Sequence, residues 1–202
     1  WSSDVCSSDL NSTMLTTLTA KYDMNFGKHA INLLAGTSYE HYNYERLYSK
    51  RTDFVSDGLE DIEQGNEVSK ETPGGSSIME SKMLSYFGRV NYSWNDRYLL
   101  EVNVRADGSS RFYKDNRWGI FPSVSAGWRI SEESFMKPVT WINNLKLRAS
   151  YGTLGNINNV GYYDYFRLMS SGSNYNFSDT AVKGVVEAQI PNTSLGWETV
   201  AL

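Results

Sequence analysis

Residues that could perform acid–base, nucleophilic or metal chemistry are few and scattered in this chain. The two histidines, His29 and His41, lie 12 residues apart, and the sequence shows no partner for either. The one cysteine, Cys6, has no second thiol with which to form a disulfide or a zinc site. Neither a G-x-S-x-G nucleophile elbow nor an H-E-x-x-H zinc motif occurs. The sequence therefore predicts no enzyme, no cofactor and no metal site.

An acidic stretch, DGLEDIEQGNE at 57–67, is the one segment that suggests a calcium loop. It lacks the D-x-D-x-D-G order and has no terminal bidentate Glu at the offset that such a loop requires. We therefore interpret it as a solvated loop.

The first ten residues, WSSDVCSSDL, differ from everything that follows them. They have no Met, no basic n-region and no apolar h-region, so they do not form a signal peptide. Read back into codons, the ten residues resemble the end of a common sequencing adapter. We predict that 1–10 are a translated adapter scar and that the native sequence is 11–202. The alternative is a genuine polar strand or linker.

Composition limits the class of protein. Without Asp4 and Asp9 of the scar, 19 bases face 21 acids, a formal net charge of −2, so a nucleic-acid partner is not expected. Aromatic residues make up 14% of the chain, and Tyr (14) outnumbers Phe (8). No run of 18 apolar residues occurs, which excludes a transmembrane helix. A transmembrane β-barrel passes this test, because only every second residue of its strands faces lipid.

Strict alternation of apolar and polar residues is the main structural signal. In 98–106, Leu100, Val102 and Val104 alternate with Glu101 and Asn103, which predicts a β-strand with one apolar and one polar face. The same period occurs clearly in 84–94, 119–130 and 145–152, and less cleanly in 14–24 and 29–48.

The connections between these segments alternate in length. The short connections carry Asn, Gly and Asp, as tight turns require, whereas the long ones are polar. The segment 131–144 is longer than a tight turn, and Ser131 followed by Glu133 predicts a brief capped helix there. Short turns on one side and long loops on the other are typical of an antiparallel transmembrane β-barrel. Short turns are predicted at 25–29 and 93–97, and long loops at about 50–80, 107–119 and 155–196.

The two predicted strand faces have different chemistry. Aromatic residues near the turns on the apolar face would suit an interfacial girdle, and charged residues on the other face would suit a wet or plugged lumen. A soluble β-sandwich with a polar outer face has the same periodicity and stays open as an alternative. The aromatic residues are Tyr92, Trp94, Tyr98 and Trp128, and the charged or polar ones are Arg89, Glu101, Asn103, Arg105, Arg129, Lys146 and Arg148.

Several linked stretches of the sequence resemble one known family. These are YFGRVNYSWNDRYLLEVNVRADGSSRF, NRWGIFPSVSAGWRISEESFM and WINNLKLRASYGTLGN, in that order. They are similar to the SusC/RagA family of TonB-linked outer-membrane transporters. The later PNTSLGWETV resembles the family's Asn-Pro-x-Leu-x-Trp-Glu segment, with Pro191-Asn192 in place of Asn-Pro. The resemblance is strong over 83–157 and extends in general layout over 11–202.

This resemblance implies an all-β fold, part of a 22-stranded plugged barrel. About seven antiparallel strands would come from this chain, with the short turns facing the periplasm and the long loops facing the outside of the cell. The plug domain, the TonB box and the rest of the barrel would lie outside this chain. The implied location is the bacterial outer membrane, crossed many times and surrounded by lipid. The implied function is TonB-dependent import of a glycan or another oligomeric nutrient such as a peptide. A SusD-like surface lipoprotein, and TonB-ExbB-ExbD acting through the plug, are the implied partners.

On this reading, ligand-binding residues would lie in the loops or the lumen. Loop aromatics could stack on sugar rings, although packing against other loops, plug or lid is the simpler interpretation. The arginines Arg89, Arg105, Arg129 and Arg148 would pair with carboxylates such as Glu101 or with acids of the plug. The candidate ligand-binding aromatics are Phe112, Tyr113, Trp118, Tyr162, Tyr163, Tyr165 and Tyr175.

Two other functions stay open. A passive porin or another outer-membrane barrel, such as a protease, would share the strand pattern. A soluble sugar-binding β-sandwich would bury the Leu, Val and Trp face instead. The barrel reading predicts that this segment aggregates when expressed alone, because its apolar face and its two sheet edges would be unprotected.

Overall fold

The computed structural model describes residues 3–52, 66–67, 74–139, 141–177 and 180–202. They divide into two units, one of 1–14 and 40–81 and the other of 15–39 and 82–202. The predicted acidic loop at 57–67 falls almost entirely outside the described residues.

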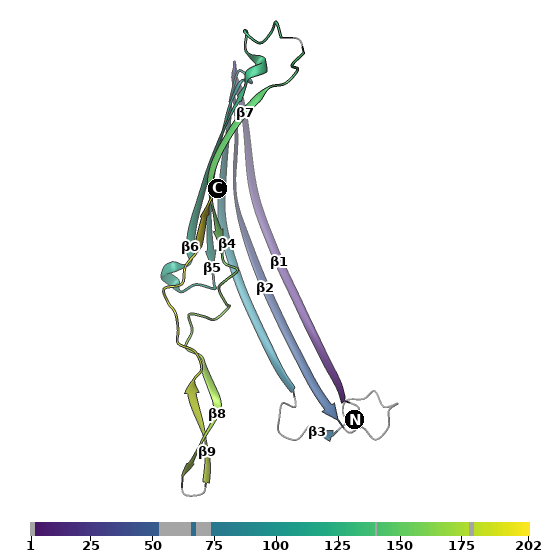
Figure 1. Ribbon diagram of the computed structural model, residues 1–202, viewed down its shortest axis with the longest axis vertical. Coiled ribbons are helices and arrows are strands. Elements are labelled where there is room, and N and C mark those ends of the chain that lie inside the picture. The colour runs from purple at the N-terminus through teal and green to yellow at the C-terminus, as the bar shows by residue number, and fades with distance from the viewer. Residues whose placement is uncertain (1–2, 53–65, 68–73, 140, 178–179) are drawn as a thin grey trace. The chain divides into compact units, whose positions relative to one another are not determined.

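Nearly all regular structure in the described part of the chain is β-strand (Figure 1). Among the described residues, the 3₁₀ turns η2 (Lys114–Asn116) and η3 (Ile130–Glu132) lie in the connections between strands. No helix among the described residues is long and apolar enough to cross a membrane. The strands are β1 (Ser3–Phe26), β2 (His29–Thr52), β3 (Asn66–Glu67), β4 (Gly74–Trp94), β5 (Tyr98–Ser109), β6 (Trp118–Arg129), β7 (Lys146–Asn156), β8 (Met169–Phe177), β9 (Thr180–Glu187) and β10 (Glu198–Ala201).

Seven strands follow one another in a single sheet in the order β1-β2-β4-β5-β6-β7-β10, and the short β3 pairs with β2. Neighbours pair antiparallel, as in β4 with β5, β5 with β6, and β6 with β7. This up-and-down order confirms the predicted fold class. The barrel is not closed by these strands.

The predicted tight turns owe their shape to residues that tolerate positive φ. Gly27, with φ of 60°, joins β1 to β2. Asn95 and Asp96, with φ of 52° and 55°, join β4 to β5, and the Arg97 N–H donates to the Trp94 carbonyl over 3.0 Å. Positive φ at both central residues matches the right-handed twist of the flanking strands.

Two connections differ from their sequence-based predictions. The helix expected in 131–144 is only the 3₁₀ turn η3, whose N-cap is Arg129 with no side-chain hydrogen bond, so the predicted Ser131 cap is wrong. The Ser131 N–H instead donates to the Leu145 carbonyl over 3.1 Å and closes the base of the connection. The long segment 155–196 contains the hairpin of β8 and β9, which the sequence did not predict.

The few buried apolar side chains of the described residues lie where the long loops meet the sheet. They are Phe112, Phe121 and Val160. The sheet itself exposes large apolar side chains along one face, including Leu100, Ile120 and Leu147. In water this face would be unfavourable, whereas in a bilayer it is solvated by lipid.

Candidate ligand-binding site

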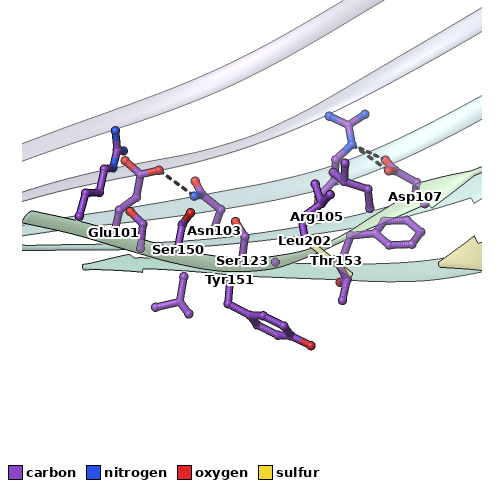
Figure 2. Close-up of a pocket in the computed structure, with 16 residues that line it drawn as sticks. Glu101, Asn103, Arg105, Asp107, Ser123, Ser150, Tyr151, Thr153 and Leu202 are labelled. Atoms are coloured by element: carbon purple, nitrogen blue, oxygen red, sulfur yellow. Dashed lines mark hydrogen bonds and ion pairs between the residues drawn. The ribbon is translucent and has the colours of Figure 1, made fainter. Parts of the chain in front are cut away.

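A hollow of about 540 Å³ lies along β5, β6 and β7, lined by residues of their polar face and also by Val124 and Tyr151 of the other face. Every second residue of β5 contributes, and the register sets Glu101 beside Ser125 and Ser125 beside Ser150. Figure 2 shows Glu101 and Asn103 on one side of the strands and Tyr151 on the other, as period-2 alternation requires.

Most of the charged side chains along this hollow form ion pairs or hydrogen bonds with neighbouring side chains. Arg105 Nε lies 2.7 Å from Asp107 Oδ1, and Arg105 Nη2 donates to Ser85 Oγ over 3.0 Å. Asn103 accepts from Arg89 Nε over 2.6 Å and donates to Glu101 Oε1 over 2.9 Å. Asn103 thus joins Arg89 to Glu101 through its amide. Arg105, by contrast, pairs directly with a carboxylate, that of Asp107. Such a surface offers hydroxyl, amide and paired charged groups to a polar ligand.

A second group of side chains, the loop cluster, joins the loop between β5 and β6 to two later segments. It consists of Arg111, Phe112, Tyr113, Val160, Tyr162, Tyr163, Tyr165, Phe166 and Trp197.

Trp197 and Phe112 form the buried part of the loop cluster. Phe112 is fully buried, and its ring centroid lies 5.4 Å from that of Trp197. Trp197 also meets Phe121 edge-on at 5.3 Å, and its Nε1 donates to the Arg117 carbonyl over 2.8 Å. Trp197, in the SLGWE segment, therefore packs the C-terminal part of the chain against the loop after β5.

Arg111 makes the second link within the loop cluster. Its guanidinium carbon lies 4.1 Å from the ring centroid of Tyr162, and its Nη1 donates to the Val160 carbonyl over 3.3 Å. Asp164 closes the same turn, because its Oδ2 accepts from the Gly161 N–H over 2.6 Å. Cation–π and backbone contacts of this kind fix the loop without a disulfide.

The outer part of the loop cluster is a patch of aromatic rings. Tyr165 lies 4.4 Å from Phe166 and 6.3 Å from Tyr113 between ring centroids. Phe166 and Tyr163 are 48% and 36% exposed. Exposed rings that are already held in place by their neighbours can stack on a flat apolar surface of a ligand at small entropic cost.

The seven predicted ligand-binding aromatics occupy different environments. Five belong to the loop cluster: Phe112, Tyr113, Tyr162, Tyr163 and Tyr165. Trp118 starts β6 on the apolar face and stacks on Tyr86 at 5.9 Å. Tyr175 lies in β8 opposite Val182, and its side chain is outside the described part. Sequence reasoning missed Phe166 and Trp197, although Trp197 stands in the family-like SLGWE stretch.

Phe112 and Trp118 are placed for packing. Phe112 has no exposed surface, so a ligand could reach it only after the loop cluster had opened. Trp118 covers Gly108 on the neighbouring strand, where an added Cβ would lie 2.9 Å from the indole.

Aromatic residues on the apolar face form two bands. At the short-turn end, Tyr98 stacks on Trp94 at 5.4 Å and on Trp128 at 6.4 Å. At the long-loop end, Tyr86 stacks on Trp118. Ten residues separate the two tryptophans of β6; at about 3.4 Å per residue and a tilt of about 40°, the bands are roughly 26 Å apart along the membrane normal. This is close to the apolar band of about 25 Å that a transmembrane barrel presents to lipid.

A carboxylate fixes the band at the short-turn end. Glu133 Oε1 accepts from the Tyr98 hydroxyl over 2.9 Å and from Trp128 Nε1 over 3.2 Å. Its Oε2 lies 3.2 Å from Arg97 Nη1. The hydrogen bond from Tyr98, then that from Trp128, and the Arg97 charge lower the pKa of Glu133.

The histidines have structural partners. His29 Nδ1 lies 2.8 Å from the Tyr92 hydroxyl, and His41 Nε2 lies 2.8 Å from Glu80 Oε1. In the part of the chain that the structure describes, no three His, Cys, Asp or Glu side chains come together as possible metal ligands.

Comparison with known proteins identifies the family. Residues 4–200 match the family described as TonB dependent receptor-like, beta-barrel. The chain belongs to the TonB-dependent receptor-like β-barrel family. It is 36% identical over 181 residues to TonB-dependent receptor P39 of Formosa agariphila, covering 89% of this chain and 17% of that protein. It is 43% identical over 119 residues to TonB-dependent receptor SusC of Bacteroides thetaiotaomicron, covering 57% of this chain and 12% of SusC.

A solved structure agrees with these relatives. The receptor chain superposes on a chain of the RagAB peptide transporter with a TM-score of 0.80 and 28% identity, covering 98% of this chain and 21% of that one. This TonB-dependent receptor chain therefore spans about a fifth or less of the length of the proteins it matches.

These findings confirm several predictions about the receptor. It is SusC/RagA-like, it is an outer-membrane β-barrel protein, and its relatives are receptors and transporters, in agreement with the prediction that it is not an enzyme. The family assignment rules out the soluble β-sandwich. The apolar face of the sheet is therefore its lipid-facing face.

Proposed function

We propose that the whole receptor imports an oligomeric nutrient, a glycan or a peptide, across the outer membrane. The similarity to SusC and to the RagAB peptide transporter carries this proposal. A SusD-like surface lipoprotein would cover the outer opening, and TonB, with ExbB and ExbD, would drive passage by pulling on a plug domain. No bond of the nutrient is made or broken.

In this proposal the loop cluster supplies ligand contacts at the outer side. Among the predicted aromatics, Tyr113, Tyr163 and Tyr165 would carry this role, joined by Phe166, because Tyr163 and Phe166 are exposed and the half-buried Tyr113 and Tyr165 lie in ring contact with each other and with Phe166. The buried Phe112 and Trp197 hold them in place. Trp118 and Tyr175 stay predictions for ligand contact. The polar face of β5–β7 would offer hydroxyl and amide groups along the path inward.

Uptake experiments in cells that lack the chromosomal receptor test the function. Full-length receptor is returned on a plasmid, and uptake of fluorescent oligosaccharides and oligopeptides is measured with and without TonB. We expect one ligand class to enter only when TonB is present. Uptake that persists without TonB would indicate a passive porin and would overturn the proposal.

The loop cluster is tested in the same cells. Replacing Tyr165 and Phe166 by Ala should weaken ligand binding about two- to tenfold, the equivalent of about 0.5–1.5 kcal/mol for an aromatic contact. Phe135→Ala is the matched control, because Phe135 is an exposed aromatic (61%) in the connection after β6, at the short-turn side. If all variants bound the ligand as tightly as the wild type, the aromatic patch would not be part of the ligand site.

A further inference from the structure

The lipid-facing side of the sheet carries a groove that the proposed import function does not use. It has a volume of about 380 Å³ and is lined mainly by apolar atoms, on β5, β6 and β7 near the short-turn end. A volume of this size is within the range of small-molecule sites, about 300–1,000 Å³.

Strand register creates the groove. Ala126 of β6 pairs with Ala149 of β7, and Leu100 of β5 pairs with Ala126. The next row toward the short turns is Tyr98, Trp128 and Leu147, whose side chains are much larger. Paired residues on one face of a sheet stand side by side, so two adjacent alanines leave a depression bounded by large side chains.

The side chains that bound the groove at its short-turn end are held in place by stacking and hydrogen bonds. Trp128 and Tyr98 stack at 6.4 Å and both donate hydrogen bonds to Glu133, which holds their polar edges toward the short-turn end, the periplasmic end of such barrels. The floor of the groove, at Ala126 and Ala149, therefore lies on the side of these side chains that is farther from the short turns. Trp and Tyr rings with a polar tip outward and an apolar body inward are typical of the membrane–water interface.

We propose that this groove binds one acyl chain of a phospholipid from the periplasmic leaflet of the outer membrane. The groove is continuous with the lipid-facing face of the sheet and lies beside the band that marks the periplasmic interface. Inside a bilayer, association depends on van der Waals packing, because lipid and protein surfaces are equally apolar. A depression over Ala126 and Ala149, bounded by Trp128 and Leu147, supplies such packing for one chain, whereas a flat face does not.

Photo-crosslinking tests the proposal on the unmodified full-length receptor. A phosphatidylethanolamine with a photoreactive group on its acyl chain is reconstituted with the receptor in nanodiscs, and labelled residues are mapped by mass spectrometry. We expect about tenfold more label at Leu100 and Leu147 than at Ile120, which lies on the same face near the other aromatic band. Label spread evenly along the face would overturn the proposal.

Groove-filling variants give a second readout. In Ala126→Leu/Ala149→Leu, native mass spectrometry should detect about one phospholipid fewer per barrel than in the wild type, because the hollow for one chain is filled. Ala106→Leu is the matched control, since Ala106 pairs with Tyr86 on the same face but outside the groove. Unchanged lipid retention in the double variant overturns the proposal. So does a loss of receptor self-association with lipid retention intact, which would assign the groove to a second copy of the chain.

Discussion

At the scale of single residues, Glu133 has the most defined role outside the strands. Its carboxylate joins Tyr98, Trp128 and Arg97 at the aromatic band near the short turns. Glu133 can reach Trp128 because it lies only a few residues after the end of β6, and the η3 turn between them brings the chain back. The sequence suggested that Glu133 was part of a helix cap, whereas the structure assigns it to the band.

The lowered pKa of Glu133 predicts a pH dependence of local stability. The charged carboxylate is stabilised in the folded state, so this contribution is present above its ordinary pKa of 4.5 and is lost as pH falls through the lower folded-state value. We therefore expect residues 130–136 to open more readily below about pH 4.5 in the wild type. In Glu133→Gln, which keeps an acceptor but has no charge to protonate, we expect a weaker response to pH.

Hydrogen exchange of this segment, corrected for the intrinsic pH dependence of exchange, measures the effect. The control is Glu132→Gln, because Glu132 is the exposed neighbouring carboxylate and should leave the wild-type pH response intact. The assignment of the pH dependence to Glu133 fails when the two variants respond alike.

At the scale of elements, glycine positions allow large rings to lie flat against neighbouring strands. Phe121 of β6 covers Gly155 of β7 and Gly119 of its own strand, where any Cβ would overlap its ring. Trp197 lies against the same Gly119. Rings that cover glycines in this way fix strand register and bring the segment before β10 onto the sheet.

This arrangement predicts a cost for a single added methyl group. Gly155→Ala should lower the unfolding free energy of the barrel by about 1–3 kcal/mol, because the Phe121 ring must leave a packed position. Gly88→Ala is the matched control, since its Cβ would meet only the Leu34 carbonyl at 3.8 Å, an ordinary contact. Urea unfolding of the full-length receptor in lipid vesicles gives both values.

A double-mutant cycle separates the ring contact from a general strand effect. On a Phe121→Ala background, Gly155→Ala should cost almost nothing, because the overlapping ring is gone. An equal cost on both backgrounds would mean that Gly155 is needed for its backbone and not for the space above it.

At the scale of the whole molecule, the sheet is one part of a larger barrel wall. The lipid-facing side of the sheet is continuous from β4 to β7. The proteins to which this chain is similar are several times longer than the chain itself. Strand β1 begins at Ser3, and Asp9 lies 3.5 Å from Arg46. A half-exposed pair of this kind contributes little to stability, and strand pairing through the backbone accepts most sequences, so an adapter-derived segment can also extend a strand.

We predict that the codons for 1–10 are absent from the genome. Amplifying outward from the codon for Asn11 and reading the upstream DNA should give a different coding sequence that leads into a plug domain. Genomic codons for WSSDVCSSDL in the same frame would instead make these residues native and would contradict the prediction.

Much of this receptor was determined by its sequence alone. Alternation along 84–94, 98–106, 119–130 and 145–152 specified strands and faces, because side chains of a strand alternate with a period of two. Asn95, Asp96 and Gly27 specified the tight turns, because they tolerate positive φ. Periodicity could not separate a barrel from a sandwich, and the family-like stretches resolved that question.

The tertiary structure decided what depends on contacts between distant segments. Phe112 and Tyr165 look alike as loop aromatics in the sequence, yet Phe112 is fully buried because Trp197, 85 residues later, packs on it. Ala126 and Ala149 are unremarkable residues of two separate strands until register sets them side by side. Local patterns determine strands and turns, whereas burial and grooves are set by which strands and loops become neighbours.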